Sequence, residues 1–389
     1  MGIIFVCYVY MKTNHIITMA LVLSTSLAGF AKNQSCDWPA IKKLKSGNLI
    51  STYTFDYWDF AKKNLPSYFK NNDLLEDGSI IGDFHFNNVG IYYNHADNQA
   101  EQKVDLAIID LDDSGEASYL ADYLKYISYL KTVTKSLDQK GLLKNYIDGL
   151  TAESLMKPKD PMPDGISELF KKGESWYSGK NDKAAVKKTN SSQTKFGKKE
   201  ELKDMTQLNT SLNQLVSNLK SKMKVLDAGY KINESGSSMG SLRIEVLGVE
   251  QKQPSLYEFK ELRCPGTELY KDQKNQTARF ADMKQALKSE NFWGPAFIAD
   301  ATDESNVEQT FLFRRKQENA LQDLNIDHMK PDKLNAYANY YSFVLGYFHG
   351  QTASKDYKKA VDKNSDQVLK GADKYSDDYI KQLTKKTKG

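Results

Sequence analysis

The chain has 389 residues, a formal net charge of +4 and 27% charged residues. A charge this close to balance lacks the strongly basic signature of a nucleic-acid-binding domain, so we expect no nucleic acid among its partners. The length suffices for one large two-lobed domain or for two ordinary domains.

The N-terminal segment has the layout of a secretory signal. Lys12 precedes an apolar run over residues 16–30, which ends in small residues. The run is too short and too rich in Ser, Thr and Gly for a membrane span of about 20 apolar residues. We assign residues 1–31 to a signal peptide with an upstream extension before Met11. We therefore expect a secreted or periplasmic protein with no integral membrane segment after cleavage, with an uncleaved anchor as the alternative.

Cysteine usage agrees with an oxidising compartment but does not settle a disulfide. Cys7 precedes the predicted mature chain, which leaves Cys36 and Cys264 as its only internal pair. Whether they are bridged stays open, and the sequence contains no Cys or His spacing typical of zinc.

Apolar periodicity predicts the elements of the first half of the chain. Helical spacing indicates helices over 53–69 and 119–130, and the segment between them indicates strands within 78–92 and over 106–111. A polar stretch follows over 157–203, with eight lysines in its second half. We interpret this stretch as a flexible insert or linker, because a solvated loop is the commoner fate of such a run than an anion-binding surface.

The second half of the chain changes from a helix to a run of strands and then back to helices, which predicts an α+β fold. The predicted elements are a helix over 208–224, a strand pair within 229–250, a strand over 255–262, a helix over 279–287, strands over 297–300 and 309–314, and helices over 333–350 and 375–385.

Two polar clusters interrupt apolar stretches and carry the chemistry. The first is GDFHFNNVG at residues 82–90, and the second is IIDLDD at residues 108–113, where carboxylates end a predicted buried strand. Carboxylates and an asparagine suit a hard divalent cation, and phosphoryl transfer needs that arrangement beside a base for the acceptor hydroxyl. The structural alternative is a tight turn in which Asp, His and Asn satisfy backbone groups.

The motifs resemble those of known phosphotransferases. GDxHxxN at residues 82–88 is similar to the catalytic loop of aminoglycoside and choline phosphotransferases, and Asp110 followed by Asp122 in a helix resembles their metal-binding segment. The motif order is closer to that of the bacterial domain of unknown function 2252 family, in which both motifs precede the Gly-rich loop. The resemblance covers most of residues 50–355. It implies a protein-kinase-like two-lobed α+β fold in circularly permuted order.

The resemblance also implies roles for single residues. Asp83 matches the catalytic base, and His85 in the same motif either shapes the loop or takes part in the chemistry. Asn88 and Asp110 match the ligands of Mg²⁺, and Asp112 is either a second metal ligand or a turn residue.

A Gly-rich loop between two predicted strands matches the segment that covers the phosphates of ATP, although an ordinary hairpin connection is the alternative. The lysine of a following strand matches the one that contacts phosphates. The implied ATP-binding residues are Gly236, Ser237, Ser238, Gly240 and Lys260.

Further positions match the family less closely. Asp282 or Glu268 is the expected acidic partner of Lys260, and Arg314 or Arg315 matches an arginine on a strand near the interlobe hinge.

Other positions have expected structural roles or depart from the family. We expect Asp122 to anchor the loop at 82–88 through hydrogen bonds, and His349 to be a core histidine with satisfied nitrogens. The chain departs from the family at Gln351, where a basic residue is expected, and at Asp113, which replaces a glutamate. These departures bear on rate and substrate more than on fold.

The implied function is transfer of the γ-phosphate of ATP to an unknown hydroxyl-bearing acceptor with Mg²⁺. Because ATP is scarce outside the cytoplasm, a catalytically inactive kinase-like binding protein is the first alternative. A metal-dependent phosphoesterase is the second, disfavoured because only one histidine of the mature chain sits in a compact acidic motif. The implied organisation is a signal peptide over 1–31, a first part of the helical lobe over 32–160, a Lys-rich insert and helix over 161–224, a nucleotide lobe over 225–318 and C-terminal helices over 319–389.

Overall fold

The computed structural model describes residues 50, 53–94, 103–108, 110–155, 162–168, 186–188, 194–196, 202–233, 240–250, 253–286, 297–302, 307–315 and 329–388. All of them belong to the second of the two units into which the chain divides, residues 38–389. The predicted signal peptide and Cys36 lie outside the described residues. Cys264 is disulfide-bonded, and the question of whether Cys36 is its partner falls outside the described residues.

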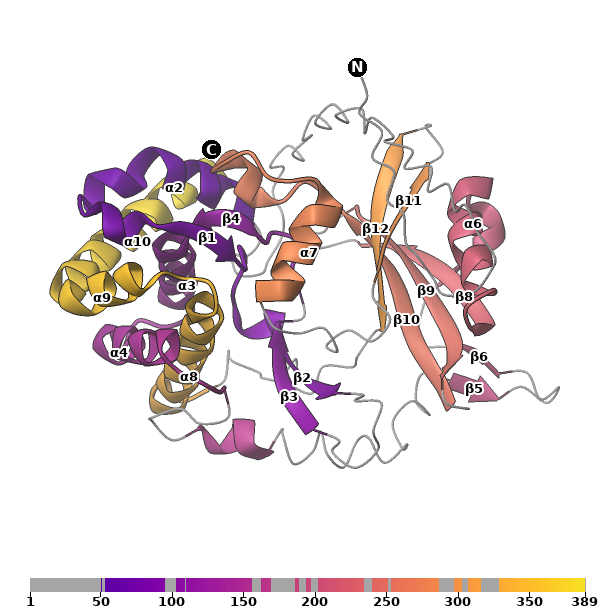
Figure 1. Ribbon diagram of the computed structural model, residues 1–389, viewed down its shortest axis with the longest axis horizontal. Helices are drawn as coiled ribbons and strands as arrows, with labels where there is room; N and C mark the ends of the chain where they lie inside the picture. The colour runs from indigo at the N-terminus through magenta and orange to yellow at the C-terminus, as the bar shows by residue number, and fades with distance from the viewer. Residues whose placement is uncertain are drawn as a thin grey trace, which may run out of the picture. The chain divides into compact units, whose positions relative to one another are not determined.

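Helices and antiparallel sheets both occur, which confirms the predicted α+β class (Figure 1). In α2, Tyr57, Trp58, Ala61 and Leu65 recur at helical spacing and are buried, as their pattern predicts. The first elements are α2 (Thr54–Tyr68), β1 (Asp77–Ile80), the short helix η2 (Phe86–Asn88), β2 (Val89–Asn94), β3 (Lys103–Ile108), β4 (Gly115–Ser118), α3 (Tyr119–Val133) and α4 (Gln139–Leu150).

Helix α4 is absent from the sequence prediction, and its packing explains why. It lies against α8 (Pro331–Gly350), and glycines let the two backbones approach closely. A Cβ atom on Gly149 would lie 2.2 Å from the carbonyl oxygen of Phe343, and one on Gly346 would lie 2.1 Å from that of Tyr146. Glycine lowers helix propensity, so tertiary packing rather than local preference stabilises this helix.

The middle of the chain forms a six-stranded antiparallel sheet in the order β11-β12-β10-β9-β8-β7. Helix α6 (Thr210–Leu219) packs on one face of this sheet (Figure 1), and α7 (Gln276–Ala286) follows β10 in sequence. The strands are β7 (Lys203–Asp204), β8 (Lys224–Ile232), β9 (Leu242–Glu250), β10 (Gln253–Leu262), β11 (Phe297–Thr302) and β12 (Glu308–Arg315).

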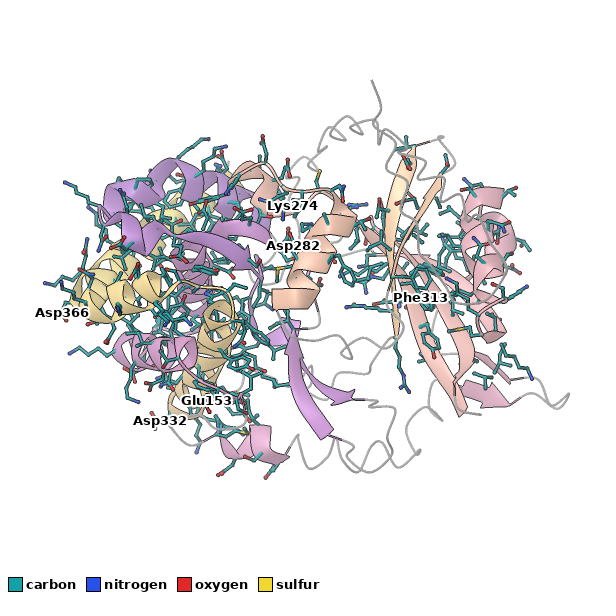
Figure 2. The ribbon with its side chains drawn as sticks, in the orientation of Figure 1. Glu153, Lys274, Asp282, Phe313, Asp332 and Asp366 are labelled. Atoms are coloured by element: carbon teal, nitrogen blue, oxygen red, sulfur yellow. The ribbon has the colours of Figure 1, made fainter. Side chains whose placement is uncertain are left out.

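The two faces of this sheet differ in chemistry. Phe259 and Phe313 belong to the hydrophobic core under α6, and Figure 2 labels Phe313 there. Because side chains alternate along a strand, Glu258, Lys260 and Arg314 lie on the opposite face. One face therefore stabilises the sheet, and the other presents charged groups.

A second hydrophobic core joins the helices of the first half to the C-terminal helices α8, α9 (Lys355–Lys363) and α10 (Ser365–Lys388). Leu262, Met283 and Leu312 of the middle segment belong to this core as well. Among the described residues, no helix is long and apolar enough to cross a membrane.

The stretch predicted as a flexible insert is only partly described, and it contains regular structure. β5 (Val186–Lys188) pairs with β6 (Thr194–Phe196) in an antiparallel arrangement. Neither strand was predicted from the sequence, and the interpretation of the stretch as a flexible insert or linker stays a prediction. Lysine-rich strands of this length give too weak an alternation to be seen in the sequence.

Candidate functional site

The two polar motifs meet at one end of a β-hairpin. We name residues 82–88 the Asp83 loop and residues 110–114 the Asp110 loop. Val89 pairs with Ile108 at the end of the β2–β3 hairpin, so the two loops leave the hairpin side by side. The backbones also touch, because a Cβ atom on Gly82 would lie 1.9 Å from the carbonyl oxygen of Asp113. Gly82 has a φ of 81°, which favours glycine as well.

Asp83 is buried and bound to two basic groups. One carboxylate oxygen contacts Nζ of Lys125, and the other lies 3.4 Å from Nε2 of His85. Burial by itself would raise the pKa of Asp83, but the charges and hydrogen bonds of Lys125 and His85 lower it. The carboxylate is therefore ionised at neutral pH, which makes it a good hydrogen-bond acceptor and a weak base.

His85 and Asn88 shape the Asp83 loop. Nδ1 of His85 accepts a hydrogen bond from the backbone N–H of Asn87 at 3.2 Å, which leaves the proton on Nε2, facing Asp83. Nδ2 of Asn88 donates to the carbonyl oxygen of Asp83 at 2.7 Å. This bond turns the amide so that Oδ1, for which the described residues offer no partner, is the atom left for a ligand.

A buried polar chain holds the Asp83 loop from behind. Asp122 accepts hydrogen bonds from the backbone N–H groups of Ile81 at 3.0 Å and Gly82 at 3.1 Å. Nε2 of His349 lies 3.1 Å from Asp122, and its Nδ1 lies 2.8 Å from the hydroxyl of Tyr146. The predictions that Asp122 anchors the loop and that His349 is a satisfied core histidine are both confirmed.

Lys260 bridges the two aspartates of the Asp110 loop. Its Nζ lies 2.8 Å from Oδ1 of Asp110 and 2.7 Å from Oδ2 of Asp112, and its side chain is 1% exposed. Burial alone would raise the pKa of Asp110, but Lys260 and then Arg314 lower it. Burial and the charge of Asp110 together raise the pKa of Asp112. The two carboxylates thus share one cation.

The expected acidic partners of Lys260 lie elsewhere. Asp282 pairs with Lys274 at 2.6 Å, and Glu268 accepts a hydrogen bond from the backbone N–H of Gln273 at 3.0 Å. The prediction that either one pairs with Lys260 is wrong. The buried ammonium instead contacts the carboxylates of the loop that follows β3, a pairing that strand spacing does not encode.

A second ion pair lies beside Lys260 on the charged face of the sheet. Glu258 accepts two hydrogen bonds from Arg314, at 2.8 and 2.7 Å, and lies 3.4 Å from Arg243. Burial would raise the pKa of Glu258, but Arg314 and Arg243 lower it to about 2. Of the two arginines considered from the sequence, Arg314 is the one paired with Glu258, whereas Arg315 is opposite Tyr257.

Most of the predicted Gly-rich loop, including Gly236, Ser237 and Ser238, lies outside the described residues. Gly240 ends the loop with a φ of 80° and donates a hydrogen bond to the carbonyl oxygen of Asn233 at 2.6 Å. This contact closes the ends of the connection between β8 and β9. Its geometry suits both a phosphate-covering loop and an ordinary hairpin.

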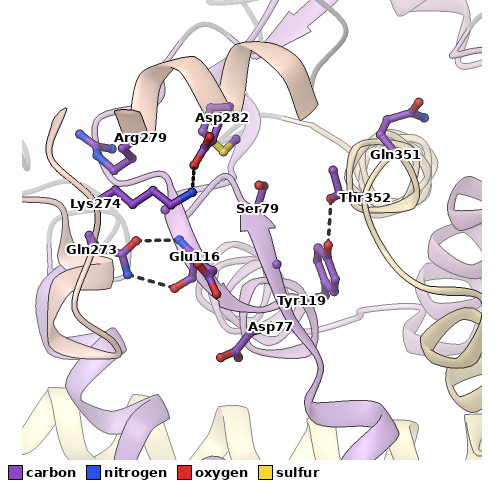
Figure 3. Close-up of a pocket in the computed structure, with 13 residues that line it drawn as sticks. Asp77, Ser79, Glu116, Tyr119, Gln273, Lys274, Arg279, Asp282, Gln351 and Thr352 are labelled. Carbon is purple, nitrogen blue, oxygen red and sulfur yellow. Dashed lines mark hydrogen bonds and ion pairs between the residues drawn. The ribbon is translucent and has the colours of Figure 1, made fainter. Parts of the chain in front are cut away.

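A separate pocket of about 670 Å³ is lined by β1, β4, α7 and the end of α8. Figure 3 shows the pairs at its wall, Lys274 with Asp282 and Gln273 with the backbone of Glu116. Asp282 and Gln351, which were considered from the sequence, line this pocket, as does Arg279. Among the described residues, the predicted catalytic, metal-binding and ATP-binding residues do not. We take the two loops as the candidate site because they combine buried ion pairs with the residues that match the catalytic and metal-binding motifs.

Basic residues of the site were missed from the sequence, and Lys125 and Arg279 illustrate why. Lys125 is a buried lysine on the mostly apolar α3, an anomaly that marks an internal ion pair. Arg279 on α7 binds the Asp110 loop and has no distinguishing local pattern. Only the lysine therefore left a signal that the sequence alone could have revealed.

The described residues contain no group of three or more His, Cys, Asp and Glu side chains placed to hold a metal ion. A metal here would depend on Asp110, Asp112 and the amide oxygen of Asn88, with remaining ligands from a phosphate or water, as is usual for Mg²⁺. The ammonium group of Lys260 between the two aspartates indicates that this point of the loop accommodates a cation.

Comparisons with protein-family models, with curated proteins and with solved structures find no match for this chain. The roles proposed below therefore rest on the geometry of the site and on the resemblance of its motifs.

Proposed function

We propose that this protein is an exported kinase-like phosphotransferase that moves the γ-phosphate of ATP to a hydroxyl-bearing acceptor with Mg²⁺. The observation that carries the proposal is the contact of Lys260 with both Asp110 and Asp112, beside the loop that presents Asp83. A strand lysine, a metal-binding aspartate and a loop with an aspartate and an asparagine are the parts that phosphoryl transfer needs.

Asp83 supports the acceptor side of the reaction. Its ionised carboxylate would accept a hydrogen bond from the acceptor hydroxyl and orient it toward the γ-phosphorus. The oxygen–phosphorus bond forms as the bond to the bridging oxygen of ADP breaks, and the hydroxyl proton leaves toward Asp83 or the transferred group. Lys125 and the Asp122 anchor hold Asp83 in place for this step.

The donor side uses the Asp110 loop and the charged face of the sheet. Asp110, Asp112 and Asn88 would hold Mg²⁺, which supplies the charge that offsets the phosphate oxygens. Binding of the metal would release the ammonium of Lys260 for the phosphates. Arg243 and Arg314 add positive charge on the same face.

The chain order supports a permuted kinase-like arrangement. The loop that ends at Gly240 joins β8 to β9, and Lys260 follows on β10, the third strand of that series. In protein kinases the phosphate-binding lysine is likewise on the third strand of the fold, and a Gly-rich loop covers the phosphates. Here the Asp83 and Asp110 loops precede these strands in the chain. Helices α8 to α10 follow the strands and pack in the same hydrophobic core as the helices of the first half.

One observation favours the second candidate, a catalytically inactive kinase-like binding protein. Active protein kinases pair the strand lysine with an acidic residue of the following helix, whereas Lys260 lies on Asp110 and Asp112. A metal-dependent phosphoesterase gains no such support, because both ring nitrogens of His85 have partners within the Asp83 loop.

Thermal unfolding of residues 32–389 with and without Mg²⁺ and ATP tests the proposal. At about 100 times its dissociation constant, ATP should stabilise the protein by about 2.7 kcal/mol. We expect this gain to require Mg²⁺ and to vanish in Asp110→Ala and Lys260→Ala, but to persist in the surface control Lys63→Ala. Radiolabelled transfer to candidate acceptors then separates the two candidates, and no stabilisation by any nucleotide would refute both.

A further inference from the structure

Arg279 of α7 clamps the backbone of the Asp110 loop. Its Nη1 donates hydrogen bonds to the carbonyl oxygens of Leu111 at 3.1 Å, Asp112 at 3.0 Å and Ser114 at 2.7 Å. The hydroxyl of Ser114 lies 3.1 Å from the same nitrogen. One guanidinium nitrogen thus binds three backbone carbonyl groups of the same turn.

The other end of the guanidinium is fixed as well. Nε of Arg279 donates to Oε1 of Gln276 at 3.1 Å, and Nη2 contacts the same oxygen. The residue is 5% exposed. Among the described residues no carboxylate lies within ion-pair distance of it, so the carbonyl groups it binds and the more distant carboxylates of Asp112, Asp113 and Glu268 together offset its charge.

The Asp110 loop therefore lies between two cations from the same part of the chain. Lys260 of β10 holds the side chains of Asp110 and Asp112, and Arg279 of α7 holds the intervening carbonyls. A third tie comes from the backbone N–H of Gly266, which donates to Asp113 at 2.6 Å. Because Arg279 binds the backbone carbonyl groups of the Asp110 loop, these groups cannot turn toward a metal ion. The carboxylates of Asp110 and Asp112 remain the oxygen ligands on the side of Lys260.

We propose that Arg279 is a positioning residue that presets the Asp110 loop for Mg²⁺. By fixing the turn, it keeps the carboxylates of Asp110 and Asp112 directed at one point before the metal arrives. This inference rests on the proposed function and deepens it, because it assigns to α7 the control of the metal site. Arginine is required since its planar fork binds Gln276 and the loop at once, which lysine cannot do.

The test compares the Mg²⁺ requirement of ATP binding in the parent protein, Arg279→Lys, Arg279→Met and the control Lys274→Met. Binding is followed by titration calorimetry on residues 32–389 over a range of Mg²⁺ concentrations. Lost support of metal ligands typically costs about 10- to 100-fold in metal affinity, so both Arg279 variants should need at least about 10-fold more Mg²⁺. Lys274 is a surface residue on the rim of the pocket, and the control should match the parent.

A second measurement needs neither metal nor nucleotide. Hydrogen–deuterium exchange of the peptide spanning residues 110–116 should be faster in Arg279→Lys than in the parent, with unchanged exchange in α3. Should Arg279→Met fail to fold, Gln276→Ala replaces it, because it frees the guanidinium without removing the buried charge.

The outcomes separate the two levels of the proposal. A parent protein that binds no ATP at any Mg²⁺ concentration would overturn the proposed function and, with it, the role of Arg279. A parent that binds ATP, with an unchanged Mg²⁺ requirement and unchanged loop exchange in the Arg279 variants, would overturn only the positioning role.

Discussion

The buried pair of Lys125 and Asp83 gives the sharpest prediction about stability. Lys125 is 1% exposed, and Lys125→Met would leave His85 as the only basic contact of the Asp83 carboxylate among the residues that the structure describes. Removing one partner of a buried pair costs about 3–5 kcal/mol, because the other charge is left without compensation. We expect about 3 kcal/mol for this variant, the lower end of that range, because the Nε2–H group of His85 still faces the carboxylate.

The double-mutant cycle with Asp83→Asn isolates the pair. Asp83→Asn alone strands the ammonium of Lys125 and should cost a similar amount, whereas the double variant leaves no buried charge and should be far less unstable than the sum. Urea unfolding of residues 32–389 at pH 7 measures all four proteins.

The coupling also has a defined pH dependence. Because the pKa of Asp83 is lowered on folding, its contribution is fully present above the ordinary value of 3.8 and is lost as the pH falls through the lowered value. Additive effects of the two substitutions, within about 0.5 kcal/mol, would refute the buried ion pair.

Three further substitutions test other parts of the site by urea unfolding and hydrogen exchange. Glu258→Gln should lower the free energy of unfolding by about 3 kcal/mol at pH 7, because folding lowers the pKa of Glu258 from 4.5 to about 2. The difference from the parent should shrink as the pH falls from 4.5 to about 2, and a pH-independent difference would contradict this. Asp122→Asn should cost about 2 kcal/mol and speed exchange at Ile81 and Gly82, whereas unchanged exchange would argue against the anchor. Gly82→Ala should cost at least about 2 kcal/mol because of its positive φ and the nearby carbonyl of Asp113, and a neutral effect would contradict that contact.

Local patterns revealed much of the secondary structure. The helical spacing around Trp58 and in α3, and the strands on either side of the Ser/Gly cluster, follow from side chains two to four positions apart. The polar motifs at Asp83 and Asp110 stood out because burying a charged group lowers stability unless the group is paired or binds a ligand. Asp122 and His349 were also assigned correctly, since a polar side chain buried on a mostly apolar helix needs a hydrogen-bond partner.

Tertiary structure alone decided which charged groups meet. Lys260 and Asp110 are 150 positions apart, and Arg279 and Leu111 are 168 apart, so no local period relates them. The choice of Arg314 over Arg315 depended on one residue of strand register, which transfers a side chain to the opposite face of the sheet. The sequence by itself determined the motifs, most elements and the α+β class, because these depend on near neighbours. The partners of Lys125, Lys260 and Arg279 depended on how distant segments pack, because buried charges are paired only by what the fold brings within a few ångströms.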